Sequence, residues 1–232
     1  MNQGPTLQRL PDDILKKVVE ALPQEVKEVL FVFPQLFVAG GAIRSILAGE
    51  PVKDIDVFTT SLDVIPSAVQ RYIMEFAPWG DWKKTETPCT TTISVNEFSP
   101  VQFVNNIEYA SPEDCIKQFD FTICQAAIWK ASIGWDSCCS PSFIRDVADK
   151  RLVYTAPDRV EAPGGSLWRA TKFLQRGYSI TQSELARLVV RCVNGQEKIR
   201  RDHCHPDHIK VGWNADQIVR SFSMRGRFGG SY

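Results

Sequence analysis

The sequence predicts an α+β protein in which helices flank a mixed β-sheet and a small helical region follows. Over residues 1–155, short apolar runs rich in β-branched residues alternate with segments of helical periodicity. A Pro/Gly-rich linker at 156–165 then separates this head from 166–222, where only helical patterns occur. The last residues, 223–232, are rich in glycine, and we expect them to form a mobile tail.

The elements of the head follow from periodicity and from the residues that end them. Residues 11–22 place apolar side chains on one stripe, with Pro23 at the end, and so predict a helix. A second short helix precedes Pro34. Further helices are predicted at 41–49, 61–77 and 111–118. Strands are predicted at 36–40, 54–60, 90–98, 100–106, 142–147 and 151–155.

Two segments of the head allow more than one interpretation. Residues 119–130, "FDFTICQAAIWK", fit either a strand or the start of a buried helix. In 82–87, "WKKTET", an aromatic residue precedes two lysines, which could stack on a base. We expect instead the mobile edge of a β-hairpin there. After the linker, helical patterns cover 166–176, 181–193 and 207–222.

Charge and cysteine content limit the possible environments and partners. The formal net charge is zero, but residues 191–232 hold eight basic and four acidic residues, so a modestly basic C-terminal segment could meet a phosphate backbone or be a solvated face. The seven scattered cysteines indicate reduced thiols and a cytoplasmic protein. The N-terminus has no signal-like apolar core, and the most apolar region, 29–47, is too interrupted to span a membrane.

The segment 37–60, "FVAGGAIRSILAGEPVKDIDVFTT", contains the residues with the clearest chemical meaning. A strand followed by Gly40, Gly41 and a helix leaves backbone N–H groups at the positive end of that helix, where an anion binds. Arg44, one turn into the helix, could add charge-assisted contacts. The pattern therefore predicts a phosphate-binding turn.

Asp54 and Asp56 lie two residues apart in a predicted strand, so their side chains point to the same face. Two adjacent carboxylates repel unless a cation lies between them, and hard oxygen ligands of this kind suit Mg²⁺. A phosphate-binding turn beside a divalent-metal site is the arrangement that nucleotidyl transfer needs.

The chain resembles the polymerase-β-like nucleotidyltransferase superfamily, and within it the head of the CCA-adding tRNA nucleotidyltransferases and bacterial-type poly(A) polymerases. Three stretches carry the resemblance in the family's order, across roughly residues 37–180. They are "VAGGAIRSILAGEPVKDIDVFT", "FDFTICQAAI" and "LWRATKFLQRGYSI". The stretch "QFVNNIEYASPEDCIKQFDFTIC" also looks like a divergent phage or viral branch.

The resemblance implies a polymerase-β-like nucleotidyltransferase head with a neck-like helical region, and it assigns roles to individual residues. Two Mg²⁺ ions would be held by Asp54 and Asp56, and Asp120 would complete the site as a third acid or by holding the ribose hydroxyl. The NTP would be the substrate. The residues implied to bind it are Gly40, Gly41, Arg44, Ser45, Lys53, Arg169, Lys172 and Arg176. The last three share one helix face, which could instead be solvated.

Several positions depart from the family's pattern. Ser45 stands where an acid usually follows the arginine, and Gln102 stands on the strand that often supplies a third carboxylate. Other departures replace the family's paired arginines, an asparagine and residues of the joining helix. The family's base-reading motif is matched only weakly. These positions are Gln118, Phe119, Cys124, Pro163, Ser166, Glu184 and Arg187. The departures weaken any inference of CCA specificity more than the inference of metal binding.

A second cluster, "RDHCHPDH", holds His203, Cys204, His205 and His208, and Cys192 lies twelve residues before Cys204. A zinc site, a loop that contacts phosphate or RNA, and ordinary surface structure all remain open, since the spacing fits no zinc template.

Three functions are compatible with these patterns. The first is NMP transfer from an NTP to the 3′ end of an RNA, such as a tRNA, with release of pyrophosphate. The second is the same chemistry with a protein or small molecule as acceptor, as in toxin-like members of the superfamily. The third is a non-catalytic nucleotide-binding or structural module, which the loss of the paired arginines favours. The oligomeric state has no sequence signal.

Overall fold

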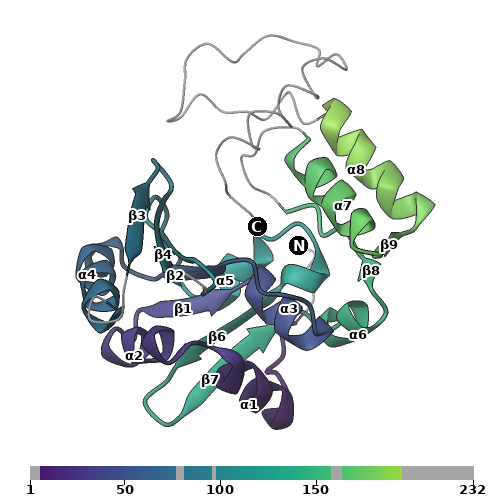
Figure 1. Cartoon of the computed structure of the whole chain (residues 1–232). Helices are drawn as coiled ribbons and strands as arrows, with labels where there is room; N and C mark the ends of the chain where they lie inside the picture. Colours follow the sequence, from purple (N-terminus) through teal and green to yellow (C-terminus); the bar gives the residue numbers. More distant parts are fainter. Residues whose placement is uncertain (1–5, 77–80, 96–97, 158–163, 195–232) are drawn as a thin grey trace.

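The computed structural model describes residues 6–76, 81–95, 98–157 and 164–194. Within them the strands form a seven-stranded sheet of order β3-β4-β5-β2-β1-β6-β7, with a separate two-stranded sheet of β8 and β9 (Figure 1). The strands are β1 (Leu36–Ala39), β2 (Ile55–Thr59), β3 (Trp82–Glu86), β4 (Thr90–Val95), β5 (Val101–Val104), β6 (Ala126–Lys130), β7 (Trp135–Cys139), β8 (Arg151–Leu152) and β9 (Ser179–Ile180).

The seven-stranded sheet is mixed, as the sequence predicts. β2 pairs with β5 in parallel, and the other neighbours in this sheet pair antiparallel. Every residue of β1, β2 and β5 is buried, and these strands lie at the centre of the sheet. β3 lies at one edge and is exposed along its whole length, which confirms the hairpin edge predicted for 82–87.

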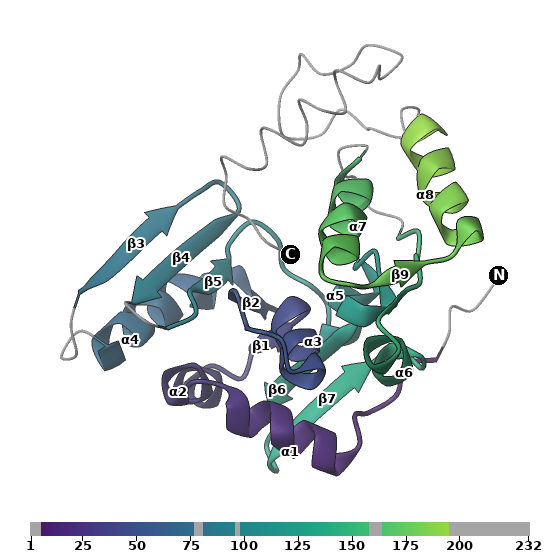
Figure 2. The same ribbon diagram turned by 45° about the vertical axis from the view of Figure 1, so that its right-hand side comes forward.

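The helices of the head pack on the sheet, and the last two helices lie beyond it. They are α1 (Asp12–Ala21), α2 (Gln24–Val32), α3 (Gly41–Ala48), α4 (Ile65–Phe76), α5 (Pro112–Lys117), α6 (Phe143–Ala148), α7 (Gly165–Gln175) and α8 (Gln182–Asn194), with short 3₁₀ turns at Leu62–Val64 and Thr122–Cys124. α3 packs on β1, β2 and β6, while α5 packs on β1, β6 and β7. α7 and α8 lie on the side of the molecule away from α4 (Figure 2).

Two predictions for the head need correction. Residues 142–147 are not a strand, because Ser142 precedes α6 and residues 143–147 belong to it. Phe143 and Val147, four residues apart, are both buried on one helical face. Residues 119–130 are neither one strand nor one helix. A 3₁₀ turn at Thr122–Cys124 comes first, and β6 starts only at Ala126. The predicted helix at 207–222 and the tail at 223–232 lie outside the described residues.

The helical region is joined to the head by polar contacts and strand pairing. β9, which follows α7, pairs in parallel with β8 of the head. The Glu184 carboxylate of α8 accepts a hydrogen bond from the backbone N–H of Tyr154 at 2.8 Å. Arg191 donates to the carbonyl of Pro157. These contacts fix α7 and α8 relative to the sheet, and this matters for the site.

Candidate active site

The double glycine joins β1 to α3, as predicted. Gly40 has φ of +87° and ψ of −130°, a conformation that residues with a side chain rarely adopt. α3 begins at the next residue, Gly41, and within the described part of the chain no side chain caps it. The N–H groups of its first turn therefore remain at a helix end whose partial positive charge favours an anion.

The two aspartates lie beside this turn at the start of β2. β1 runs antiparallel to β2 with Val38 opposite Val57, so the residues that follow β1 lie next to those that begin β2. Asp54 is 9% exposed and Asp56 is 4% exposed. Burial raises the pKa of Asp56 well above its usual value, and the charge of Asp54 raises it further. The two carboxylates therefore lie close enough to repel each other.

Gln102 of β5 completes this edge of the sheet. It lies opposite Asp56 in the parallel register, and its side chain is buried. Its Nε2 donates a long hydrogen bond of 3.5 Å to Oδ2 of Asp54. The sequence identified Gln102 only as a departure from the family. The structure shows that it is a neutral partner of Asp54.

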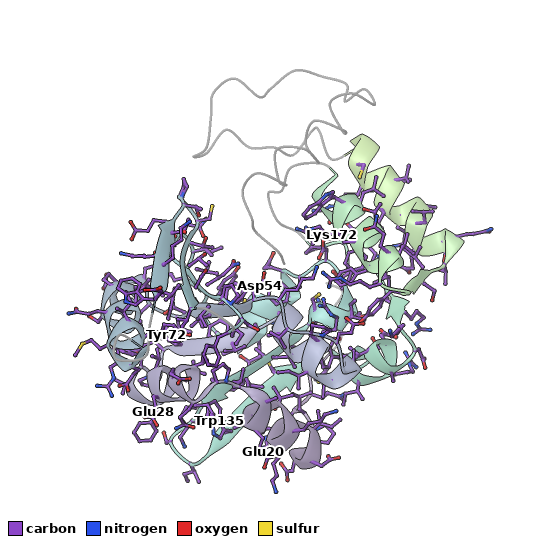
Figure 3. All side chains as sticks on the ribbon, in the orientation of Figure 1. Glu20, Glu28, Asp54, Tyr72, Trp135 and Lys172 are labelled. Atoms are coloured by element: carbon purple, nitrogen blue, oxygen red, sulfur yellow. The ribbon has the colours of Figure 1, made fainter. Side chains whose placement is uncertain are left out.

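A basic face of α7 lies over the same place, as Figure 3 shows for Asp54 and Lys172. Burial lowers the pKa of Lys172, and Lys53 and Arg176 lower it further, whereas the charge of Asp54 raises it. The pKa of Arg176 is likewise lowered, first by burial and then by Arg44, and raised by Glu50 and Asp54. Cations from two distant segments therefore gather beside the carboxylates, which makes the surroundings attractive to an anion.

Arg44 and Ser45 lie beneath this surface rather than on it. The Arg44 guanidinium is buried, donates to Ser45 Oγ at 2.9 Å and lies 4.8 Å from the Phe173 ring centroid. Arg176 lies 5.7 Å from the same ring. The aromatic ring of α7 thus contacts two cations, and Arg44 connects α3 to α7.

Asp120 forms an ion pair with Arg169 of α7, with Oδ2 and Nε 2.5 Å apart. Both residues are almost fully buried, at 3% and 4% exposure. The pair links the turn before β6 to α7 and so holds the basic face in position. Within the described ranges, no group of three or more Asp, Glu, His or Cys side chains could together hold a metal.

The donor set at β2 nevertheless fits a divalent cation. Asp54 and Asp56 supply hard carboxylate oxygens, and the unfavourable burial of Asp56 next to a second charge is what a bound cation would relieve. Mg²⁺ commonly takes one or two protein carboxylates and completes its shell with water and substrate phosphates. Two carboxylates without a third acid are therefore sufficient.

A family of known sequences matches this chain. Residues 12–150, more than half of the chain, match the family described as "Gabija anti-defense 2 family protein". The chain belongs to the Gad2 family. This name agrees with the divergent phage or viral branch that the sequence suggested, although the sequence did not point to Gad2 itself. No curated protein matches this Gad2 chain in sequence.

Solved structures share the fold of this Gad2 chain. The complex of a CCA-adding enzyme with ATP has a TM-score of 0.58 at 16% identity and covers 82% of this chain and 47% of that one. The Thermotoga maritima CCA-adding enzyme complexed with tRNA gives 0.55 at 18%, covering 94% and 54%. A "tRNA-processing enzyme (apo form I)" gives 0.56 at 20%, covering 82% and 50%. The chain spans about half the length of these proteins and has the fold of the CCA-adding enzyme head.

Sequence reasoning missed several residues that shape the site of this Gad2 chain. Glu50 had no recognisable signal, yet it lies 4.0 Å from Arg44 and 3.6 Å from Lys150. Phe173 was visible only as an apolar position in a helical pattern. Glu184, which weakly matches a base-reading motif in the sequence, connects α8 to the head through its hydrogen bond with Tyr154 and also pairs with Arg187.

The histidine cluster cannot be placed in this Gad2 structure. His203, Cys204, His205 and His208 lie outside the described residues, while Cys192 of α8 is partly buried. Within the described residues, no helix is long and apolar enough to cross a membrane.

Proposed function

We propose that this chain is a metal-dependent nucleotidyltransferase, which moves NMP from an NTP to a hydroxyl acceptor and releases pyrophosphate. The observation that carries the proposal is the buried pair Asp54 and Asp56, placed between the glycine turn after β1 and the basic face of α7. A non-catalytic module has little reason to bury two adjacent carboxylates, because their repulsion destabilises the empty site.

Each part of the site has a distinct task in this proposal. Asp54 and Asp56 would hold two Mg²⁺ ions, which when bound neutralise the phosphates and lower the pKa of the attacking hydroxyl. Gln102 orients Asp54. The glycine turn, Lys53, Lys172 and Arg176 bind the triphosphate as positive groups.

The remaining assigned residues position these groups. Asp120 and Arg169 hold α7 in place through their buried ion pair. Arg44 and Ser45 support α3 against Phe173 of α7. They act on the nucleotide through the elements they fix, in place of the direct contacts that the resemblance implies for them.

The first candidate acceptor is the 3′ end of an RNA. It is supported by the likeness of the fold to CCA-adding enzymes, one of them complexed with tRNA, and by the excess of basic residues in 191–232. The second candidate is a protein. The family's description as anti-defense favours it.

The test incubates the chain with each α-³²P-labelled NTP, Mg²⁺ and one acceptor pool. The pools are total RNA and lysates of cells with and without the Gabija system. We expect wild-type protein to label a pool and Asp54→Asn or Asp56→Asn to lose the label. Asp63→Asn, which changes an exposed acid elsewhere, is the matched control.

The position of the label decides between the acceptors. Label on RNA supports the first candidate, and label on a protein band supports the second. If NTP binds but no pool is labelled, the chain is a non-catalytic member and the proposal fails.

A further inference from the structure

Trp168 and Lys172 form a pair on the face of α7 that borders the site. They lie four residues apart, so one helical turn separates them on the same face. Lys172 Nζ is 3.4 Å from the centroid of the Trp168 ring. The ring is partly exposed, in contrast to Arg169 and Phe173, which face the head and are buried.

Among the described residues, the contacts that hold α7 in place run through side chains other than Trp168. The attachment of α7 runs through the ion pair of Arg169 with Asp120 and through the ring contacts of Phe173 with Phe121 and Tyr178. Trp168 instead presents a flat aromatic ring at the edge of a surface rich in cations. Such a combination is what proteins use to hold a base and a phosphate of one nucleotide.

We propose that Trp168 is a stacking surface for the nucleobase of the NTP whose phosphates bind beside Lys172. This inference rests on the proposed function, because it assumes that a triphosphate occupies the surface between Asp54 and α7. Every base has a π-face, so stacking on an indole ring tolerates all four bases. The site then accepts several NTPs, with purines bound more tightly than pyrimidines because they stack over a larger area.

Lys172 links the two parts of this binding mode. In the structure its ammonium group lies over the indole ring and near Lys53, a second cation. A triphosphate attracts an ammonium group more strongly than a neutral ring does, because both partners carry full charges. Movement of Lys172 toward the phosphates then frees the ring face for the base.

The alternative aromatic residue is Trp82 of β3, which is 39% exposed and is followed by two lysines. β3 is the edge strand, and two strands, β4 and β5, separate it from β2 and the carboxylates. Trp168 is favoured because its neighbour Lys172 lies near enough to Asp54 for that charge to raise the pKa of the lysine. Trp82 therefore provides a matched control of the same residue type.

The experiment measures dissociation constants for inorganic tripolyphosphate and for four non-hydrolysable NTP analogues in the presence of Mg²⁺. The variants are Trp168→Leu, Trp168→Phe and Trp82→Leu. We expect Trp168→Leu to weaken binding of all four analogues about ten-fold or more and to leave tripolyphosphate unchanged. Trp168→Phe should keep most of the affinity, since it retains an aromatic face, and Trp82→Leu should bind like wild type.

Two results would overturn the inference. The first is equal analogue binding by wild type and Trp168→Leu. If a short RNA, measured in the same way, then binds Trp168→Leu more weakly than wild type, the ring belongs to the acceptor site. The second is an equal loss for tripolyphosphate, which would mean that α7 itself is disturbed. If wild type binds neither tripolyphosphate nor any analogue, the proposed function itself fails.

Discussion

At the scale of single residues, the site is built around two buried carboxylates, Asp54 and Asp56, whose mutual repulsion is unfavourable when no cation is bound. Asp54 and Asp56 lie next to each other with little access to water, and the neutral side chain of Gln102 donates a hydrogen bond to Asp54. An amide there adds a donor without adding charge. The site therefore has two carboxylates. A third acid at position 102 would increase both the repulsion among the carboxylates and their attraction for a metal ion.

Gln102→Glu should change stability and metal binding in opposite directions. The third carboxylate is expected to lower the stability of the metal-free protein by roughly 1–3 kcal/mol, since it replaces a hydrogen-bond donor with a like charge. It should also tighten Mn²⁺ binding by adding a hard oxygen ligand. Thermal unfolding with EDTA and with Mn²⁺ measures both effects. Gln70→Glu on the exposed side of α4 is the control, and an equal response in both variants would contradict the prediction.

The raised pKa of Asp56 predicts a pH dependence of stability. The folded state binds this proton more tightly than the unfolded state, so the carboxyl group adds stability below the usual Asp pKa of about 3.9. That stability is lost as the pH rises through the higher pKa of the folded state. In EDTA, wild type should therefore lose stability relative to Asp56→Asn as the pH rises, and saturating Mg²⁺ should reduce the difference.

Urea unfolding between about pH 4 and pH 8 measures this difference, because an ordinary Asp ionises near pH 4 and the raised pKa of Asp56 lies above that value. Asp63→Asn should follow wild type at every pH. A constant gap between wild type and Asp56→Asn would show that the carboxylate is not strained by its surroundings.

At the scale of elements, α7 determines whether the cations meet the carboxylates. Two of its buried residues contact the rest of the protein: Arg169 forms an ion pair with Asp120, and the ring of Phe173 packs against that of Tyr178. The face of α7 that holds Arg169 also carries Lys172 and Arg176, which lie within electrostatic range of Asp54. The same helix therefore joins the two parts of the chain and supplies the positive half of the site.

Asp120→Asn tests this role. Removing one charge of a buried ion pair leaves Arg169 uncompensated, so the free energy of unfolding should fall by about 3 kcal/mol. Asp54→Asn should have no such cost in metal-free buffer, because it relieves repulsion instead. Chemical denaturation compares the two variants. Unchanged stability in Asp120→Asn together with weaker Mg²⁺ binding would make Asp120 a metal ligand.

Most of the elements could be predicted because their signals are local. The buried strand before Gly40, the helix after it and the serine cap of α5 each follow from a few neighbouring residues. The error at 142–147 arose because six residues are too few to separate a period of two from a period of 3.6. There, tertiary burial of Phe143 and Val147 decides the outcome.

The site could be predicted only in part because some of its contacts are long-range. Asp54 and Asp56 were recognisable by their spacing, and the basic stripe of α7 by helical periodicity. No local pattern shows that Arg44 faces Phe173, which lies far along the chain, or that Asp120 pairs with Arg169. Such contacts depend on how α7 returns to the head.

At the scale of the whole molecule, the nature of the acceptor should show in the salt dependence of binding. If RNA is the acceptor, its affinity falls as KCl rises, because bound Lys and Arg side chains release counterions from the phosphates. Replacing Arg200 and Arg201 with Gln should reduce the slope of log affinity against log salt by about 1 to 2.

Filter binding of a tRNA from about 50 to 200 mM KCl measures this slope. Lys16→Gln with Lys17→Gln, on the exposed side of α1, keeps the same change in net charge and should leave the slope unchanged. An equal change in both double variants would mean that net charge, rather than the segment 191–232, attracts the RNA.

The parallel pairing of β2 with β5 has a consequence for how this molecule reaches its native state. Asp54 and Gln102 are separated by 48 positions in the chain, and Asp120 and Arg169 by 49. Contacts that close such long loops form slowly, because the entropy of closure is lost before they can contribute. A refolding chain therefore acquires its helical circular dichroism signal first, and the meeting of Asp54 with Gln102 and of Asp120 with Arg169 emerges in a later kinetic phase.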